Sequence, residues 1–155
     1  MKLTTKGRYA VMAMADLARF SSGRPVALAD IAQRQEISLS YLEQLFAKLR
    51  RGDLVKSVRG PGGGYLLARP ADNIRISDVI LAVDEPIKAT RCEIGSPKGC
   101  MGSSSSRCIT HDLWEGLSYQ IQGFLSGVSL GDVINGRLAK APDLMDKPLA
   151  ATAAD

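Results

Sequence analysis

The stretch SLSYLEQLFAKLRRGDLVKSVRGPGGGYLLA, residues 38–68, decides the fold of this chain. Its first half predicts an amphipathic helix, with Ser40 as N-cap, Glu43 completing a capping box and Gly52 as the C-terminal stop. The apolar residues of that helix recur at the i, i+3, i+4 and i+7 positions that form one buried face: Leu42, Leu45, Phe46 and Leu49. The opposite face is polar and is left exposed to a ligand.

The second half of the stretch predicts a β-hairpin. Residues 54–58 and 65–68 are two short strand-like runs, and Arg-Gly-Pro-Gly-Gly-Gly at positions 59–64 joins them. Four of these six joining residues lack a Cβ atom, so the hairpin tip can approach another backbone closely. The same run argues against a nucleotide-binding P-loop, because no Gly-Lys-Ser/Thr follows it and a strand, not a helix, comes next.

Two helices are expected before this stretch. Apolar residues recur at helical spacing in residues 6–20, and a shorter pattern of the same kind spans residues 28–33. A polar link, residues 34–38, then makes a tight turn with Ile37 as its one apolar plug. The order helix, helix, turn, helix, hairpin predicts a winged helix-turn-helix, and the fold class is therefore mainly α with a small β-hairpin.

The chain after the hairpin predicts more helices and one long loop. Ser77 can cap a helix that Pro86 ends, and residues 92–107 are a loop rich in Gly and Ser. Thr110 can cap a long helix, and a last helix is expected at residues 130–138. The long helix carries a wide apolar stripe: Leu113, Trp114, Leu117, Ile121, Phe124, Leu125 and Val128. We interpret it as a C-terminal dimerisation helix, the alternative being that it packs on the chain's own core.

Charge divides the chain into two halves. Residues 1–70 contain 12 Lys and Arg against 5 Asp and Glu, whereas residues 71–155 contain 8 against 11. This asymmetry favours a polyanionic partner for the first half, with a solvated basic surface as the alternative. We expect a DNA-binding winged helix-turn-helix region at 1–70, a ligand-binding loop with dimerisation helices at 71–138 and a flexible tail at 139–155.

Membrane and secretory signals are not expected in this sequence. No apolar run approaches the roughly 20 residues that cross a bilayer, and the N-terminus lacks the pattern of a signal peptide. We therefore expect a cytoplasmic protein without a membrane partner. An odd count of three cysteines then favours reactive or metal-binding thiols over a disulfide framework.

Candidate DNA contacts lie on three of the predicted elements. At the N-terminal end of the third helix, Gln44 can pair with adenine, and Glu43 can accept from cytosine while repelling phosphate, which makes it a filter. Arg59, followed by Gly60, can enter a narrow minor groove from the hairpin tip. The other candidates are Lys6, Arg8, Tyr9, Ser38, Ser40 and Tyr41. The alternative for each residue is an ordinary solvated surface position.

The three cysteines and the only histidine share the spacing Cys92-x7-Cys100-x7-Cys108-x2-His111. Thiolates and imidazole are ligands of zinc and of iron-sulfur clusters. Cys108 is expected just outside the long helix and His111 in its first turn, so that both can face one centre. The long intervals fit a 2Fe-2S cluster at least as well as zinc, whose structural sites use short cysteine knuckles, and unligated thiols are the third alternative.

Six stretches together carry a resemblance to a known family. They are LTTKGRYAV at 3–11, ISLSYLEQLF at 37–46, SVRGPGGGYLL at 57–67, AVDE at 82–85, ATRC at 89–92 and CITHDLW at 108–114. With these stretches the chain, from its first residues to about Asn135, closely resembles the IscR family of bacterial iron-sulfur cluster regulators.

The resemblance implies a homodimeric winged-helix transcription factor that binds double-stranded DNA and a 2Fe-2S cluster. It implies that Cys92, Cys100, Cys108 and His111 hold the cluster. It also implies that Tyr41, Glu43 and Gln44 face bases and that Arg59 enters the minor groove. Such proteins control cluster-assembly genes: they repress their own operon when clusters are plentiful, and they act, as repressor or activator, at a second class of promoter without the cluster. Both intervals between cysteines are longer here than in the family, which bears on cluster stability.

Three functions are weighed on these grounds. The leading hypothesis is a transcription regulator that senses iron-sulfur cluster status. The second keeps DNA binding but makes the thiols a redox or nitric-oxide switch without a cluster. The third, a small electron carrier or thiol enzyme, is disfavoured because such a protein has no use for a glycine-rich wing, and no catalytic base other than His111 is found. The chain is therefore predicted not to be an enzyme.

Overall fold

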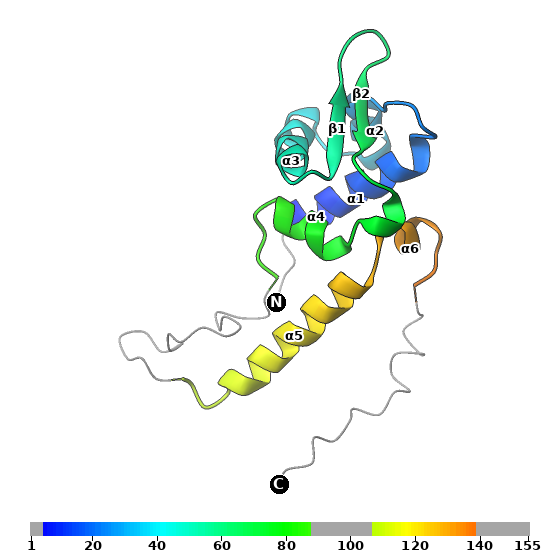
Figure 1. Ribbon diagram of the computed structural model, residues 1–155. Coiled ribbons are helices and arrows are strands. Elements are labelled where there is room, and N and C mark those ends of the chain that lie inside the picture. The colour runs from blue at the N-terminus through cyan, green and yellow to red at the C-terminus, as the bar shows by residue number, and fades with distance from the viewer. Residues whose placement is uncertain (1–4, 88–106, 139–155) are drawn as a thin grey trace.

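The computed structural model describes residues 5–87 and 107–138, and the predicted tail at 139–155 lies outside them. A helical body carries a two-stranded hairpin at one end, and a long helix extends away from the other end (Figure 1). The elements in chain order are α1 (Thr5–Phe20), α2 (Leu28–Gln35), α3 (Leu39–Arg51), β1 (Val55–Val58), β2 (Gly64–Leu67), the 3-10 helix η1 (Ala71–Asn73), α4 (Ile76–Ala82), α5 (His111–Gly127) and α6 (Leu130–Ile134). The predicted fold class is confirmed.

The helices α1, α2 and α3 pack around one apolar core, to which α4 and α6 also contribute. From α1, Met14 and Leu17 are fully buried, and from α3 the predicted stripe contributes Leu42, Leu45, Phe46 and Leu49, each at most 2% exposed. The α2 helix adds Ile31, which is also fully buried. Because these side chains fill one face of each helix, the opposite face of α3 is turned outward.

The turn between α2 and α3 is built on two adjacent residues. Glu36 adopts a left-handed conformation with φ of 55°, and Ile37, 5% exposed, fills the core as the predicted plug. The α2 helix continues to Gln35, two residues beyond the prediction. The N-cap of α3 is Ser38 and not Ser40, because the amide of Leu42 already donates to the carbonyl of Ser38 at 3.1 Å. The predicted capping box at Ser40 was therefore wrong.

The hairpin is a short antiparallel pair attached to the body by a third backbone segment. Val55 pairs with Leu67 and Val58 with Gly64, within one residue of the predicted strands. Val26, which precedes α2, exchanges two backbone hydrogen bonds with Tyr65, at 3.0 and 2.8 Å. The wing is thus held on the helical body by a further strand-like bridge.

Gly64 is required where β2 meets this bridge. A Cβ atom there would overlap the carbonyl of Val26 and lie 2.9 Å from the amide of Ala27, and the φ angle is +156°. We expect Gly64→Ala to lower the free energy of unfolding by about 1–3 kcal/mol from backbone strain alone. Gly62→Ala is the matched control, since its Cβ would meet nothing within 4 Å and only its φ of +71° is costly. Urea unfolding curves with coincident midpoints for the two variants would contradict the expected steric role.

Two predicted details of the C-terminal half are corrected by the structure. The α4 helix begins at Ile76 with Arg75 as N-cap, where the amide of Arg75 donates to Asp78 at 3.3 Å, so the predicted Ser77 cap was wrong. Ser77 instead lies inside the helix and is 5% exposed. The α6 helix ends at Ile134, short of residue 138, and the left-handed Gly136 follows it.

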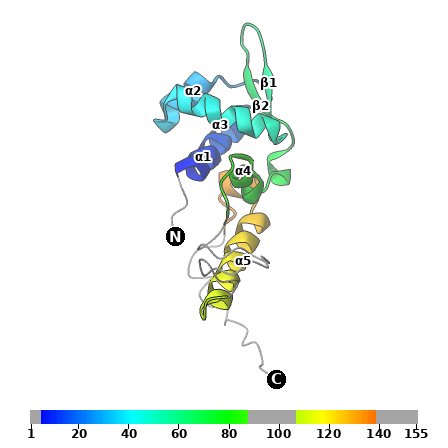
Figure 2. The ribbon, with the colours of Figure 1, turned by 90° about the vertical axis from the view of Figure 1, so that its left-hand side faces the viewer.

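The C-terminal end of α5 is fixed to the body, while the rest of the helix projects from it (Figure 2). Ile76 donates to the carbonyl of Val128 at 3.0 Å, and Leu130 donates to the carbonyl of Ile74 at 2.8 Å. The α5 helix also contacts α4. Thr110 is the N-cap, as predicted, although its side chain does not cap the helix backbone.

Much of the apolar stripe of α5 is uncovered by the described part of the chain. Leu113 is 63% exposed, Leu117 37% and Phe124 52%, whereas Ile121 and Leu125 are half-buried. The described part of the chain therefore covers the predicted stripe only in part. None of the described helices combines the length and the apolar character needed to span a membrane.

Candidate DNA interface and metal centre

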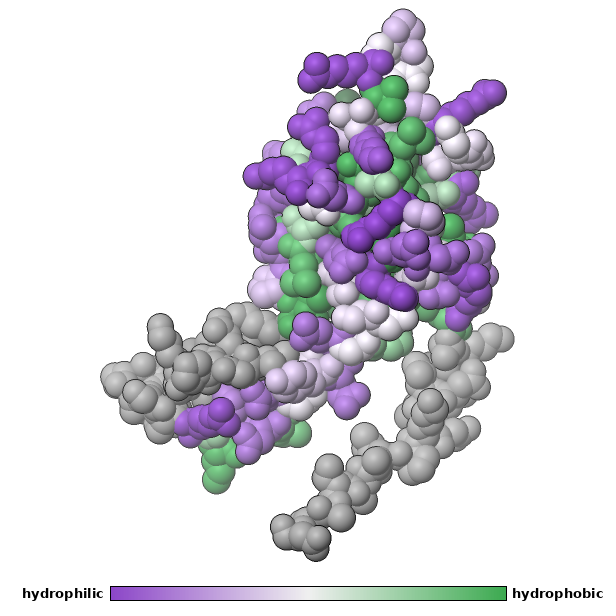
Figure 3. Space-filling view, viewed as in Figure 1, coloured by the Kyte–Doolittle hydropathy of each residue, from purple (hydrophilic) through white to green (hydrophobic). Residues whose placement is uncertain are grey.

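The α3 helix exposes to solvent most of the residues that were predicted to contact DNA. Ser38, Ser40, Glu43 and Gln44 are exposed, and Tyr41 is half-buried. They lie at the N-terminal end of α3, where side chains of a recognition helix reach base edges in the major groove. Hydrophilic side chains cover much of the surface at this end of the molecule (Figure 3). The face was correctly predicted because the buried stripe of α3 determines which residues remain outside.

The start of α1 lies against the start of α3. The ring of Tyr9 meets the ring of Tyr41 edge to face, with centroids 6.0 Å apart and planes at 82°. Arg8, one residue earlier, is exposed, and Lys6 is half-buried. All of these residues were predicted from the sequence as DNA contacts, but the contact between the two rings was not; an aromatic residue near the start of each helix was its only signal. The contact joins the start of α1, which carries the predicted phosphate-binding residues, to the start of α3.

The wing carries its predicted residues at the tip. Arg59 and Gly60 are exposed, and Gly60 has a φ of +101°. The amide of Gly63 donates to the carbonyl of Gly60 at 2.9 Å and closes the tip into a narrow turn. In both ribbon views the hairpin extends beyond the helices (Figures 1 and 2). A guanidinium at such a tip can reach a groove that the helices do not enter.

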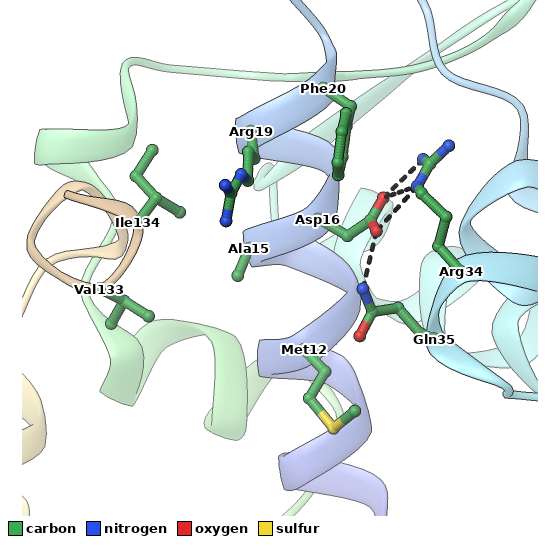
Figure 4. Close-up of a pocket in the computed structure, with 9 residues that line it drawn as sticks. All are labelled: Met12, Ala15, Asp16, Arg19, Phe20, Arg34, Gln35, Val133 and Ile134. Carbon is green, nitrogen blue, oxygen red and sulfur yellow. Dashed lines mark hydrogen bonds and ion pairs between the residues drawn. The ribbon is translucent and has the colours of Figure 1, made fainter. Parts of the chain in front are cut away.

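A buried carboxylate supports the turn that leads into α3. Asp16 of α1, whose side chain is fully buried, accepts from Arg34 at 2.6 and 3.0 Å and from Gln35 at 2.8 Å (Figure 4). The Arg34 guanidinium also lies 4.4 Å from the ring centroid of Phe20, and the hydrogen bond that it donates to Asp16 raises the pKa of Arg34. Because Arg34 and Gln35 end α2, these bonds fix the turn that leads into α3.

A cavity of about 580 Å³ lies beside this cluster, between α1, the end of α2 and α6. Its lining residues are Met12, Ala15, Asp16, Arg19, Phe20, Arg34, Gln35, Val133 and Ile134. Asp16 points away from α6 toward Arg34 and Gln35, as Figure 4 shows. Since the carboxylate is committed to that ion pair, we assign the cluster a structural role in holding α2 against α1.

Two of the four predicted metal ligands lie in the described residues, and they share one turn at the start of α5. The amide of His111 donates to the carbonyl of Cys108 at 3.0 Å. Cys108 is half-buried and His111 is 2% exposed. Thr110, between them, has its hydroxyl 3.7 Å from the Cys108 sulfur and accepts from the indole of Trp114 at 3.2 Å. Cys92 and Cys100 lie outside the described residues.

The donor set of this turn fits an iron-sulfur cluster in chemistry, because thiolate and imidazole are its ligands. Carboxylates stand next to them. His111 Nε2 lies 4.0 Å from Glu115 Oε1, and one ligand atom each from His111, Asp112 and Glu115 lie within 4.8 Å of one another. Such a set could also hold a divalent cation, but Asp112 is 91% exposed and pairs with Arg107 at 3.7 Å. A carboxylate beside a ligating imidazole commonly orients its ring.

Comparison with known proteins shows the family of this chain. The family model described as Rrf2, iron-dependent transcriptional regulator, matches residues 3–136. The chain belongs to the Rrf2 family. Family membership, together with the winged-helix fold, makes it a DNA-binding transcription regulator, and its curated relatives carry the names of regulators and not of enzymes.

Relatives of this Rrf2 protein are similar along nearly its whole length. The HTH-type transcriptional regulator IscR of Photorhabdus laumondii is 57% identical over 137 residues, which cover 88% of this chain and 81% of the relative. The regulator of the same name from Escherichia coli O1:K1 is 55% identical and is covered to 82%. These identities confirm the resemblance to the IscR family.

Solved structures support the same fold for this Rrf2 protein. The IscR of T. potens has a TM-score of 0.69 at 35% identity, with 93% of this chain and 96% of that chain covered. CymR, the global cysteine regulator of B. subtilis, has a TM-score of 0.73 at 32% identity, with 88% and 98% covered. The fold is thus shared by regulators whose names point to different signals.

Proposed function

We propose that this protein senses iron-sulfur cluster status through a bound 2Fe-2S cluster and controls genes of cluster assembly. Cys92, Cys100, Cys108 and His111 would hold the cluster. The observation that carries the proposal is the turn at the start of α5, which joins a half-buried thiol and a buried imidazole through a 3.0 Å backbone hydrogen bond. The IscR relatives support it by name.

The protein would work as a homodimer in the cytoplasm, where its DNA lies. Exposed Leu113, Leu117 and Phe124 on a helix that projects from the body support a partner helix at that surface. Apolar side chains this far outside a core are stabilised when a second copy covers them. Two copies would also present two reading helices to a two-fold symmetric operator.

Each DNA contact has its own task in this proposal. Lys6 and Arg8 would neutralise phosphate and fix the register, and Gln44 would pair with a base. Glu43 would repel phosphate and accept a hydrogen bond only from a suitably placed base amino group, so that it disfavours sequences without that group. Arg59 would insert into a narrow minor groove, attracted by its negative potential. Ser38, Ser40, Tyr9 and Tyr41 would complete the interface.

When bound, the cluster would supply an iron-sulfur centre whose presence depends on iron, sulfide and oxidants. The chain's residues would do the rest. The buried position of His111 would keep its imidazole oriented and shielded from water. Glu115 would hold that ring, and Thr110 would place its hydroxyl between the Cys108 sulfur and Trp114.

The experiment that tests the proposal begins with protein purified without oxygen. We expect a coloured protein with visible absorption bands and two irons and two sulfides per bound cluster. Cluster-loaded and cluster-free protein should each be used to enrich duplex DNA from a random-sequence pool, and the two should enrich different sequences. A colourless protein with stoichiometric zinc, or one whose thiols oxidise reversibly without iron, would overturn the proposal in favour of a zinc site or a thiol switch.

Removal of the acidic filter should broaden DNA recognition. We expect Glu43→Ala to accept duplexes that the wild type rejects, with a loss of discrimination worth about 1–3 kcal/mol at the affected base pair. Arg59→Ala is the contrast, because it should weaken binding chiefly where the minor groove is narrow. It should also reduce the slope of log affinity against log salt concentration by about one. Fluorescence-anisotropy titrations on a panel of duplexes distinguish the two. Uniform loss on every duplex for both variants would contradict these roles.

A further inference from the structure

Two consecutive acidic residues link the ligand-binding half to the DNA-binding half. The α4 helix ends at Ala82, and Asp84 then adopts a left-handed conformation with φ of 58°, its amide donating to the carbonyl of Leu81 at 3.0 Å. Glu85 follows, and Cys92 comes seven residues later in the sequence. The turn sends the two neighbouring carboxylates to two different helices of the body.

Asp84 forms an ion pair with α3, the helix that carries the proposed base contacts. Its carboxylate lies 2.7 Å from the ammonium of Lys48, in the last turn of α3. The hydrogen bond from Lys48 lowers the pKa of Asp84, and the charges of Lys6 and Arg51 lower it further. A side chain that is 74% exposed gains little stability from such a pair, so the contact is poorly explained as a stabiliser of the fold.

Glu85 is bound to the start of α1. It is 5% exposed, and its carboxylate accepts from the amide of Gly7 at 2.5 Å, in the first turn of α1. A negative charge at a helix N-terminus is favoured by the helix dipole and satisfies an amide that has no partner within the helix. Gly7 is required for this approach, since a Cβ atom there would lie 2.6 Å from Glu85 Oε2.

Both contacts end on helices that carry candidate DNA contacts. Lys48 belongs to the helix of Glu43 and Gln44, and Gly7 lies between Lys6 and Arg8. The end of α4 is also close-packed on α3, because a Cβ atom on Gly52 would lie 3.1 Å from the Cβ of Ala82. A shift of the chain at Asp84 and Glu85 would therefore change the contacts of α1 and α3 together.

We infer that Asp84 and Glu85 are positioning residues that pass the state of the ligand-binding segment to the two DNA-contacting helices. The inference rests on the proposed function, since it takes occupancy of the Cys92 segment as the signal. A ligand shifts a protein between states only through contacts that differ between them. In the described part of the chain, the Asp84–Lys48 and Glu85–Gly7 contacts bind residues 84 and 85, which precede this segment in the sequence, to α3 and α1.

The test uses two pairs of variants in the full-length protein. Asp84→Asn removes the charge and keeps a residue type that tolerates the left-handed conformation. Its control is Asp53→Asn, an exposed residue after α3 that has a φ of 54° and loses the same charge. Gly7→Ala pushes the Glu85 carboxylate aside without changing charge. Its control is Gly116→Ala on α5, where a Cβ would meet nothing within 4 Å.

The measured quantity is the ratio of DNA affinities with and without the cluster, on a duplex enriched by the wild-type protein. Couplings of this kind commonly amount to about 5- to 150-fold. We expect the ratio in Asp84→Asn and Gly7→Ala to fall by about threefold or more, while Asp53→Asn and Gly116→Ala keep the wild-type ratio. Hydrogen exchange of the first turn of α1 should also respond to the cluster in the wild type and in the controls, but not in the two test variants.

The possible outcomes separate this inference from the proposed function. If the wild type shows the ratio and both test variants keep it, the inference is overturned and the proposed function stands. If the wild type binds no cluster, or binds DNA equally with and without it, both are overturned. A loss of coupling accompanied by a lower unfolding midpoint than that of the matched control would also overturn the inference, because it would reveal a role in folding alone.

Discussion

Cys108→Ala should purify without iron or sulfide and without the visible absorption of the wild type. Cys108 shares a turn with buried His111 and is one of three proposed thiolate ligands, and a cluster held by four ligands loses an iron bond with each one removed. The expected iron and sulfide content is close to zero after anaerobic purification or reconstitution. Binding to duplexes selected by the cluster-free wild type should persist, because no DNA contact is altered.

Two further variants make this result specific. Thr110→Val removes the hydroxyl that accepts from Trp114 at 3.2 Å but no ligand, so it should keep iron and sulfide. His111→Cys should retain a cluster with a lower reduction potential, since imidazole ligands raise the potential relative to thiolates. Trp114 is the only tryptophan, so its fluorescence gives a second readout of occupancy. Full iron content in Cys108→Ala would remove this residue from the ligand set.

Phe46→Ala should destabilise the protein more than any other single change proposed here, by about 3–5 kcal/mol. Phe46 is fully buried in α3, and its ring meets the ring of Tyr65 in β2 with centroids 4.9 Å apart and planes at 68°. The substitution leaves a cavity between the reading helix and the wing and removes an aromatic contact. Most domains are stable by only about 5–15 kcal/mol, so a substantial unfolded fraction is expected.

Phe46→Leu is the matched control for this cavity. It keeps most of the apolar volume, and swaps that conserve volume usually cost less than about 1.5 kcal/mol. Urea unfolding of both variants, followed by far-UV circular dichroism at equal protein concentration, measures the difference in their midpoints. Equal midpoints for the two variants would show that the ring is not what joins α3 to the wing.

The elements of the fold were predictable because local patterns specify them. The stripe that contains Leu42 and Phe46 predicted α3, and the glycine-rich run at 59–64 predicted the hairpin. The caps at Ser40 and Ser77 were wrong for a shared reason. A Ser followed by an acidic residue resembles a start signal, but the first backbone bond of each helix forms two residues earlier, at Ser38 and at Arg75.

The candidate site was predictable in residue type and only partly in geometry. The sequence pointed to Cys108 and His111 as ligands, and the structure adds the turn that joins them and the carboxylate of Glu115 beside the imidazole. It also places Tyr9 on Tyr41, two residues that the sequence had assigned to separate helices. Contacts between positions so far apart in the chain leave no periodic signal.

The sequence by itself determined the winged helix-turn-helix, the outward face of α3 and the choice of thiol and imidazole side chains as candidate ligands, because periodicity, glycine placement and ligand chemistry are properties of short segments. Only the tertiary structure decided that Asp16 holds the end of α2, that Asp84 pairs with Lys48 and that Glu85 binds the first turn of α1. These contacts arise where distant segments pack together, and a carboxylate acquires its partner from that packing and not from its neighbours in the chain.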